Sequence, residues 1–134
     1  MFDETNAYCS INVDAEIKEA DLAQKLAHLF GTTPDGNYVD TDNGTIGILT
    51  NDDFDSELRK DSKRGFLYYN ILLEVEPKVE LGEENAVHFV SKILKYLWSE
   101  DYPATAACAY EDALPNKGKL IPENHSWNEY YIWK

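Results

Sequence analysis

The side chains with the most specific chemistry in this chain are two cysteines, Cys9 and Cys108, and three histidines, His28, His88 and His125. The cysteines form no Cys-x-x-Cys motif, and no histidine lies near either of them in the sequence, so the pattern indicates neither a zinc site nor thiol catalysis. We expect two buried free thiols, which the topology predicted below would bring onto neighbouring strands. The sequence therefore predicts no metal site and no cofactor.

A calcium loop is the next chemistry to consider. The stretch Asp40-Thr41-Asp42-Asn43-Gly44 has alternating carboxylates, and carboxylate oxygen is a ligand that calcium prefers. The stretch departs from the EF-hand pattern because a glycine occupies the fifth position, where a ligand is required. Asn-Gly between two extended segments is typical of a β-hairpin with a type I′ turn, and we interpret the stretch in that way.

Catalytic motifs are the third possibility. The chain has no Ser-His-Asp order, no glycine-rich phosphate loop and no His-x-x-x-His pair. Paired acids such as Glu83-Glu84 and Glu111-Asp112 could act in acid–base catalysis only if a pocket enclosed them. The sequence leans towards a protein that is not an enzyme, and we recognise no known family in its motifs.

The most distinctive pattern is a concentration of acids between residues 35 and 57, where seven acids occur and no base. We expect them to make one end of the sheet, near the hairpin and the loop after it, strongly negative. Clustered acids beside aromatic side chains favour docking of a cationic partner, because charge steers the encounter and aromatic rings anchor it. The predicted partner-binding residues are Tyr38, Asp40, Asp42, Asp52, Asp53, Phe54, Asp55, Glu57 and Tyr68.

Overall charge restricts the partners. The 134-residue chain carries 25 acids against 12 bases, a formal net charge of -13, which disfavours binding to nucleic acid. No apolar run approaches the roughly 20 residues that cross a bilayer, and the N-terminus lacks the basic and apolar parts of a signal peptide. We expect a cytoplasmic protein with no membrane contact.

Periodicity predicts the elements that must position these residues. Alternating apolar residues predict strands, and apolar residues three and four apart predict helices. The polar stretch 51–65 is expected to be a loop or a short surface helix. The predicted elements are a strand over 8–13, a helix over 16–30, hairpin strands over 38–41 and 45–50, a long strand over 66–76, a helix that begins at Gly82, and a strand over 104–110.

This order predicts an α+β fold of the ferredoxin-like βαββαβ type, an antiparallel sheet with two helices on one face. We expect residues 1–110 to form the core, with the first strand beside the long one, and residues 111–134 to form an aromatic C-terminal extension packed on it. The other sheet face would carry Tyr8, Ser10 and Asn12 from the first strand. It would also carry residues of the long strand, namely Phe66, Tyr68, Asn70 and Leu72.

Two functions remain open. The first is a non-catalytic acidic binding protein, concretely an immunity or inhibitor protein that neutralises a basic toxin or nuclease by steric and electrostatic blockade. The alternative is a small-molecule-binding domain or enzyme, with a site between the open sheet face and the C-terminal segment that Tyr68, Trp127 and Tyr130 would line. The sequence leaves open whether the protein is a monomer or a homodimer.

Overall fold

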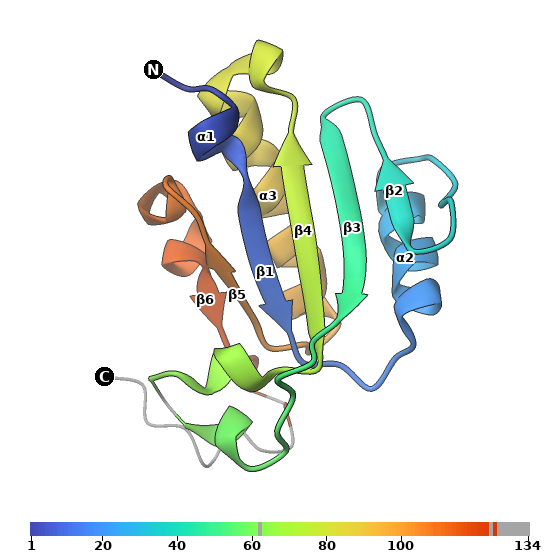
Figure 1. The fold of residues 1–134 in the computed structure, drawn as a ribbon, viewed down its shortest axis with the longest axis vertical. Coiled ribbons are helices and arrows are strands. Elements are labelled where there is room, and N and C mark those ends of the chain that lie inside the picture. The colour runs from blue at the N-terminus through green and yellow to red at the C-terminus, as the bar shows by residue number, and fades with distance from the viewer. Residues whose placement is uncertain (62, 124, 126–134) are drawn as a thin grey trace.

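The protein has an α+β fold built on one open, antiparallel six-stranded sheet (Figure 1). The computed structural model describes residues 1–61, 63–123 and 125. The strand order across the sheet is β2-β3-β4-β1-β5-β6. The strands are β1 (Cys9–Val13), β2 (Tyr38–Asp40), β3 (Gly44–Thr50), β4 (Ile71–Pro77), β5 (Ala104–Ala107) and β6 (Lys119–Leu120).

The two long helices lie on one face of this sheet (Figure 1). They are α2 (Glu19–Leu29) and α3 (Gly82–Ser99), and a single turn, α1 (Glu4–Ala7), precedes β1. Acidic residues occupy the first turn of each long helix, where the helix dipole favours negative charge. Short 3-10 turns connect the elements, namely η1 (Leu58–Lys60), η2 (Gly65–Tyr68), η3 (Val79–Leu81), η4 (Glu111–Ala113) and η5 (Pro115–Gly118).

The main core fills the space between the sheet and the two helices. Alternate residues of β1 and β4, such as Ile11 and Leu73, are fully buried against the apolar stripes of α2 and α3. Phe30 at the end of α2 and Phe89 of α3 meet edge to face, with 5.1 Å between their ring centroids. The alternation and the helix stripes seen in the sequence therefore face this core as predicted.

The predicted ferredoxin-like topology is not confirmed, because the strand order differs. β1 does lie between β4 and β5 and pairs antiparallel with both. The sheet is longer than the predicted arrangement, since β2 extends it at one edge and β6 at the other. What the structure supports is the α+β class with a wholly antiparallel sheet.

The predicted long strand over 66–76 is wrong in its first half. Strand β4 begins at Ile71, and the preceding residues form the 3-10 turn η2. Two side-chain amides explain the change: Asn51 Nδ2 donates to the carbonyls of Leu67 and Tyr69, and Asn70 exchanges two hydrogen bonds with the backbone of Ala15. These contacts satisfy backbone groups that would otherwise need a strand partner.

The hairpin between β2 and β3 is present, but its type I′ turn is not. A type I′ turn needs two residues with positive φ, and only Gly44 has one here, at 156°. The turn is held instead by the Thr41 hydroxyl, whose Oγ1 accepts from the amides of Asn43 and Gly44 at 3.0 and 3.1 Å.

The remaining predicted boundaries shift by a few residues. The first helix begins at Glu19 rather than at residue 16, because Lys18 is extended, and the last predicted strand ends at Ala107 rather than at residue 110. The part of the C-terminal extension that the structure describes contains η4, η5 and the edge strand β6. Among the described helices, none has the length and apolar character to cross a bilayer.

Candidate functional site

The sheet face away from the helices carries a row of exposed aromatic and acidic side chains. The strand register places one residue from each of β2, β3, β4 and β1 in a row, namely Tyr38, Gly47, Glu74 and Ser10. The neighbouring row contains Asp40, Thr45 and Glu76. Cross-strand neighbours point to the same side of a sheet, so these residues share one surface. We call it the acidic sheet face and define it as Tyr8, Tyr38, Asp40, Leu49, Leu72, Glu74 and Glu76.

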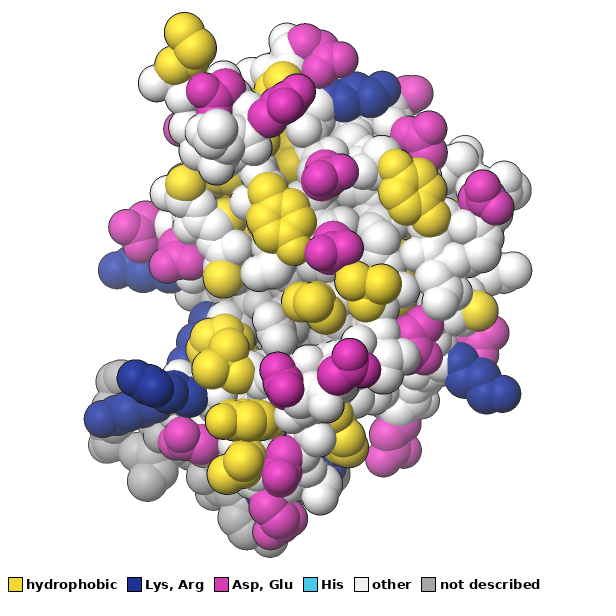
Figure 2. All heavy atoms as spheres, in the orientation of Figure 1, with side chains coloured by type: hydrophobic (Ala, Val, Ile, Leu, Met, Phe, Trp, Pro, Cys, Tyr) yellow, Lys and Arg dark blue, Asp and Glu magenta, His cyan; other side chains and the backbone are white. Residues whose placement is uncertain are grey.

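This face is open to solvent. Three of its large hydrophobic side chains, Tyr8, Tyr38 and Leu49, are 40%, 46% and 41% exposed, and Leu72 is half-buried. Figure 2 looks onto it and shows acidic side chains standing among hydrophobic ones, with the lysines and arginines at the margins. Exposed apolar area among polar and charged side chains is typical of an interaction surface.

Tyr8 is tied to the acidic row. Its hydroxyl donates to Glu74 Oε2 at 3.4 Å. Burial of part of the ring, together with the negative charge of Glu74, raises the pKa of the Tyr8 phenol above its usual value. The hydroxyl therefore stays protonated at neutral pH, and the ring is held beside the carboxylates.

A hollow of about 440 Å³ lies over the middle of the face, where Gly47 has no side chain. Tyr38 and Glu74 flank this glycine in the same row, and Tyr8 and Glu76 complete the wall. A Cβ built on Gly47 would have its nearest neighbours 3.9 Å away, so the space above the glycine is real and can be filled. The lining contains no lysine or arginine among the described residues.

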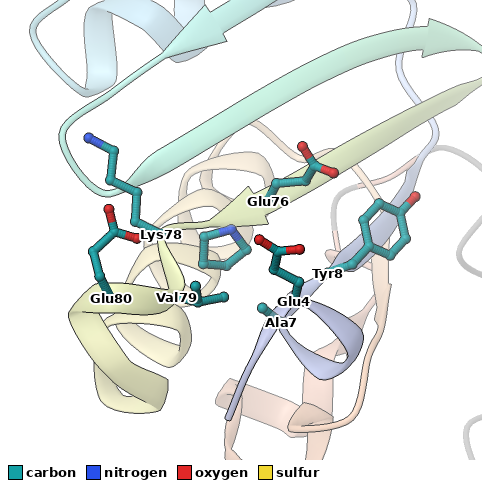
Figure 3. A pocket seen from close by; sticks show the side chains of 8 residues that line it. Glu4, Ala7, Tyr8, Glu76, Lys78, Val79 and Glu80 are labelled. Carbon is teal, nitrogen blue, oxygen red and sulfur yellow. The ribbon is translucent and has the colours of Figure 1, made fainter.

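A second hollow, of about 410 Å³, lies where α1 and η3 rise at the end of the sheet. It shares Tyr8 and Glu76 with the first, and we call the two adjoining hollows together the groove. Figure 3 shows the carboxylates of Glu4 and Glu76 pointing into the same space, with the Tyr8 ring beside them and Lys78 on the other side. Negative charge in this groove matches a cationic group.

Part of the predicted partner-binding set belongs to this surface. Tyr38 and Asp40 lie on β2 within the acidic sheet face, and Asp42 is exposed in the turn that follows. The other predicted acids, Asp52, Asp53, Asp55 and Glu57, follow β3 rather than precede it.

The two groups of acids are consequently at opposite ends of β3, and the prediction that they make one end of the sheet negative is wrong. They are separated by the seven residues of this strand, which span about 20 Å. The acids can be counted in the sequence, but the sequence does not show that the strand carries the chain from one end of the sheet to the other. No single partner side chain can contact both groups.

The loop after β3 uses some of its residues for its own structure. Asp55 Oδ1 accepts from the amides of Glu57 and Leu58, both at 2.9 Å, and these hydrogen bonds lower the pKa of its carboxyl. Phe54 is exposed, with the Arg59 guanidinium over its ring at 5.6 Å from the centroid. Tyr68 ends η2 and is half-buried. Whether these residues contact a partner stays a prediction.

The alternative ligand site cannot be built from the described residues. Trp127 and Tyr130, which would line it with Tyr68, lie outside them. Within the described part of the chain, no three or more histidine, cysteine, aspartate or glutamate side chains are grouped to hold a metal ion.

Two features of the surface were missed or undervalued in the sequence. Glu74 and Glu76 alternate with the buried residues of β4, yet they are not among the partner-binding residues predicted above. Glu4 was missed altogether, because the short helix α1 that carries it has no apolar stripe. The alternation of β4 beside Tyr8 was the signal that could have identified the acidic row.

A buried ionic cluster at the end of β1 was also missed. Asp14 is 4% exposed and accepts two hydrogen bonds from Arg59 Nη1, at 3.1 and 3.2 Å. His125 Nε2 lies 3.6 Å from the same carboxylate, and His125 Nδ1 is 3.2 Å from the carbonyl of Asp101. The cluster joins β1 to the loop after β3 and to the C-terminal segment, so we assign it a structural role.

Comparison with known proteins gives no further assignment. No family model matches the chain, and searches of curated proteins and of solved structures found no significant match.

Proposed function

We propose that this chain is a non-catalytic binding protein that docks a partner with a cationic surface on its acidic sheet face. The observation that carries the proposal is the groove in which Tyr8 and Glu76 belong to both hollows, flanked by Glu4, Glu74 and Tyr38. Tyrosine supplies a large contact area at small entropic cost, and carboxylates pair with lysine or arginine. An inserted cationic side chain would also meet the aromatic ring of Tyr8.

The acids after β3 have a different part in this proposal. Asp52, Asp53 and Glu57 are exposed and lie beyond the far end of the strand, so they raise the association rate by long-range attraction. Close contacts at the groove, by contrast, control how long the partner stays.

The most concrete form of the proposal is an immunity or inhibitor protein. A basic toxin or nuclease must keep a cationic surface for its substrate, and an acidic tyrosine-bearing sheet would cover that surface and block access. The net charge of -13 supports this form, because it repels nucleic acid and attracts proteins that bind nucleic acid.

NMR titration of the full chain with an oligoarginine peptide tests the docking surface. We expect the largest amide shifts at Tyr8, Gly47, Glu74 and Glu76. Gly47→Val should reduce them, because its side chain fills the central hollow without a backbone clash. Shifts spread evenly over all acidic segments, or largest at residues 52–57, would contradict the proposal.

A further inference from the structure

Cys9 is the first residue of β1, and Cys108 directly follows the last residue of the neighbouring strand β5. Ser10 of β1 pairs with Ala107 of β5, so Cys9 and Cys108 come next in the same antiparallel register. Directly opposed residues in such a ladder have Cα atoms about 4.5–5.5 Å apart. A disulfide needs about 4.4–6.8 Å, so a register that continues one residue past Ala107 places the two cysteines within reach of each other.

Each thiol shifts the pKa of the other, which agrees with the register, and neither is in a disulfide. The Cys9 Sγ donates to the carbonyl of Ser10 at 3.7 Å. Cys9 is fully buried in the main core, whereas Cys108 is only half-buried and lies just past the end of β5. A small reagent from solvent therefore reaches Cys108 first.

We infer that Cys9 and Cys108 form an oxidisable dithiol, with Cys108 as the site that a hydroperoxide modifies and Cys9 as the thiol that resolves it into a disulfide. The inference is independent of the docking surface. It rests on the opposed register and on the unequal exposure of the two residues.

The chemistry balances in two steps. The Cys108 thiolate attacks one oxygen of the hydroperoxide, so that a sulfur–oxygen bond forms, the oxygen–oxygen bond breaks, and the alkoxide leaves and takes up a proton. The sulfur of Cys9 then attacks the Cys108 sulfenic acid, the disulfide forms, and water leaves with the proton of Cys9. The thiols lose two electrons and the peroxide gains them.

The surroundings favour this division of roles. The neighbouring Cys9 thiol lowers the pKa of Cys108, and the amide of Tyr110 acts in the same direction. The influence of Cys108, together with burial, raises the pKa of Cys9. Cys108 is therefore the sulfur that ionises first, and the thiolate is the form that reacts with peroxides.

Treatment of the native protein with hydrogen peroxide, followed by intact-mass measurement and peptide mapping, tests the inference. We expect the loss of two hydrogen masses, a peptide that links Cys9 to Cys108, and full recovery of both thiols with dithiothreitol. Thiols that stay free, Cys108 that accumulates as sulfinic acid, or covalent dimers as the main product would each overturn it.

Two variants separate the roles. In Cys9→Ala the sulfenic acid on Cys108 should persist and react with dimedone, because its resolving thiol is absent. In Cys108→Ser the buried Cys9 should react at least about tenfold more slowly than Cys108 does in the native protein. If Cys9→Ala fails to fold, the second variant still decides, because Cys108 is only half-buried. Equal oxidation of Cys9 in that variant would contradict the assigned order.

Discussion

The hydroxyl of Tyr8, the residue before β1, donates to the carboxylate of Glu74 on β4, with 3.4 Å between Oη and Oε2. This contact joins the aromatic and the acidic parts of the open face, and the hollow above Gly47 lies beside it. The ring is therefore presented at a fixed place among the carboxylates, as an anchor for a cationic partner requires.

Replacement of Tyr8 separates the ring from the hydroxyl. Tyr8→Phe should change the free energy of unfolding by less than about 0.5 kcal/mol, because the hydrogen bond is long and exposed, and it should leave oligoarginine affinity nearly unchanged. Tyr8→Ala should weaken that affinity about tenfold, since it removes the contact area. Urea unfolding and isothermal titration calorimetry measure the two effects. Equal loss of affinity in both variants would show that the ring is not the anchor.

Two glycines of β3 should respond in opposite ways to alanine. A Cβ at Gly44 would lie 2.5 Å from the Glu76 carbonyl oxygen and 2.8 Å from Phe89 Cε2, and φ is positive there. We expect Gly44→Ala to cost about 3 kcal/mol in the free energy of unfolding. Gly47→Ala meets nothing closer than 3.9 Å and should be neutral or stabilise by up to about 1 kcal/mol. Similar urea midpoints for the two variants would contradict the close approach at Gly44.

Stability should fall in alkaline solution. Burial, with a further contribution from Glu100, raises the pKa of Tyr96 from 10.0 to about 12. An unfolded chain releases this proton near pH 10, whereas the folded protein holds it to about pH 12. The contribution of Tyr96 to the free energy of unfolding is therefore fully present below pH 10 and is lost between these values. The urea midpoint measured from about pH 9 to 12 should decline, and less steeply in Tyr96→Phe. An unchanged slope in that variant would rule out Tyr96 as a source.

The ion pair of Asp14 and Arg59 should matter more for stability than the exposed pairs do. The Asp14 side chain is 5% exposed and that of Arg59 is 23% exposed. We expect Asp14→Asn to lower the free energy of unfolding by about 2 kcal/mol. This is less than the full cost of breaking a buried ion pair, because water reaches Arg59. Glu57→Gln, which breaks the exposed pair with Lys60, should cost less than about 0.5 kcal/mol. Chemical denaturation of both variants makes the comparison, and equal costs would argue against a buried ionic cluster.

Local patterns in the sequence were sufficient to predict the elements that pack on the core. The alternation around Ile11 and the stripe of α3 both predicted the buried faces, because each depends only on neighbouring residues. The segment 66–70 has an equally regular alternation, yet it forms η2. Its backbone is held by Asn51 and by the contact of Asn70 with Ala15, which are distant in the sequence.

The candidate site was predictable to a smaller extent. The sequence identified a surface with acids and tyrosines, and Tyr38 and Asp40 do lie on it. It could not show that β3 separates Asp40 from Asp52, since this depends on the path of the chain in space. It also could not show that α1 brings Glu4 to Glu76, because a single helical turn has too few residues to produce a periodic pattern.

Two double variants with the same change in charge provide the sharpest comparison. Glu74→Gln with Glu76→Gln neutralises the acidic row, and Asp52→Asn with Asp53→Asn neutralises two exposed acids beyond the far end of β3. The dissociation constant for oligoarginine should rise about tenfold in the first variant and less than about threefold in the second at physiological salt. An equal rise in both variants, or a larger rise in the second, would mean that net charge alone drives binding and that the acidic sheet face is not a docking surface.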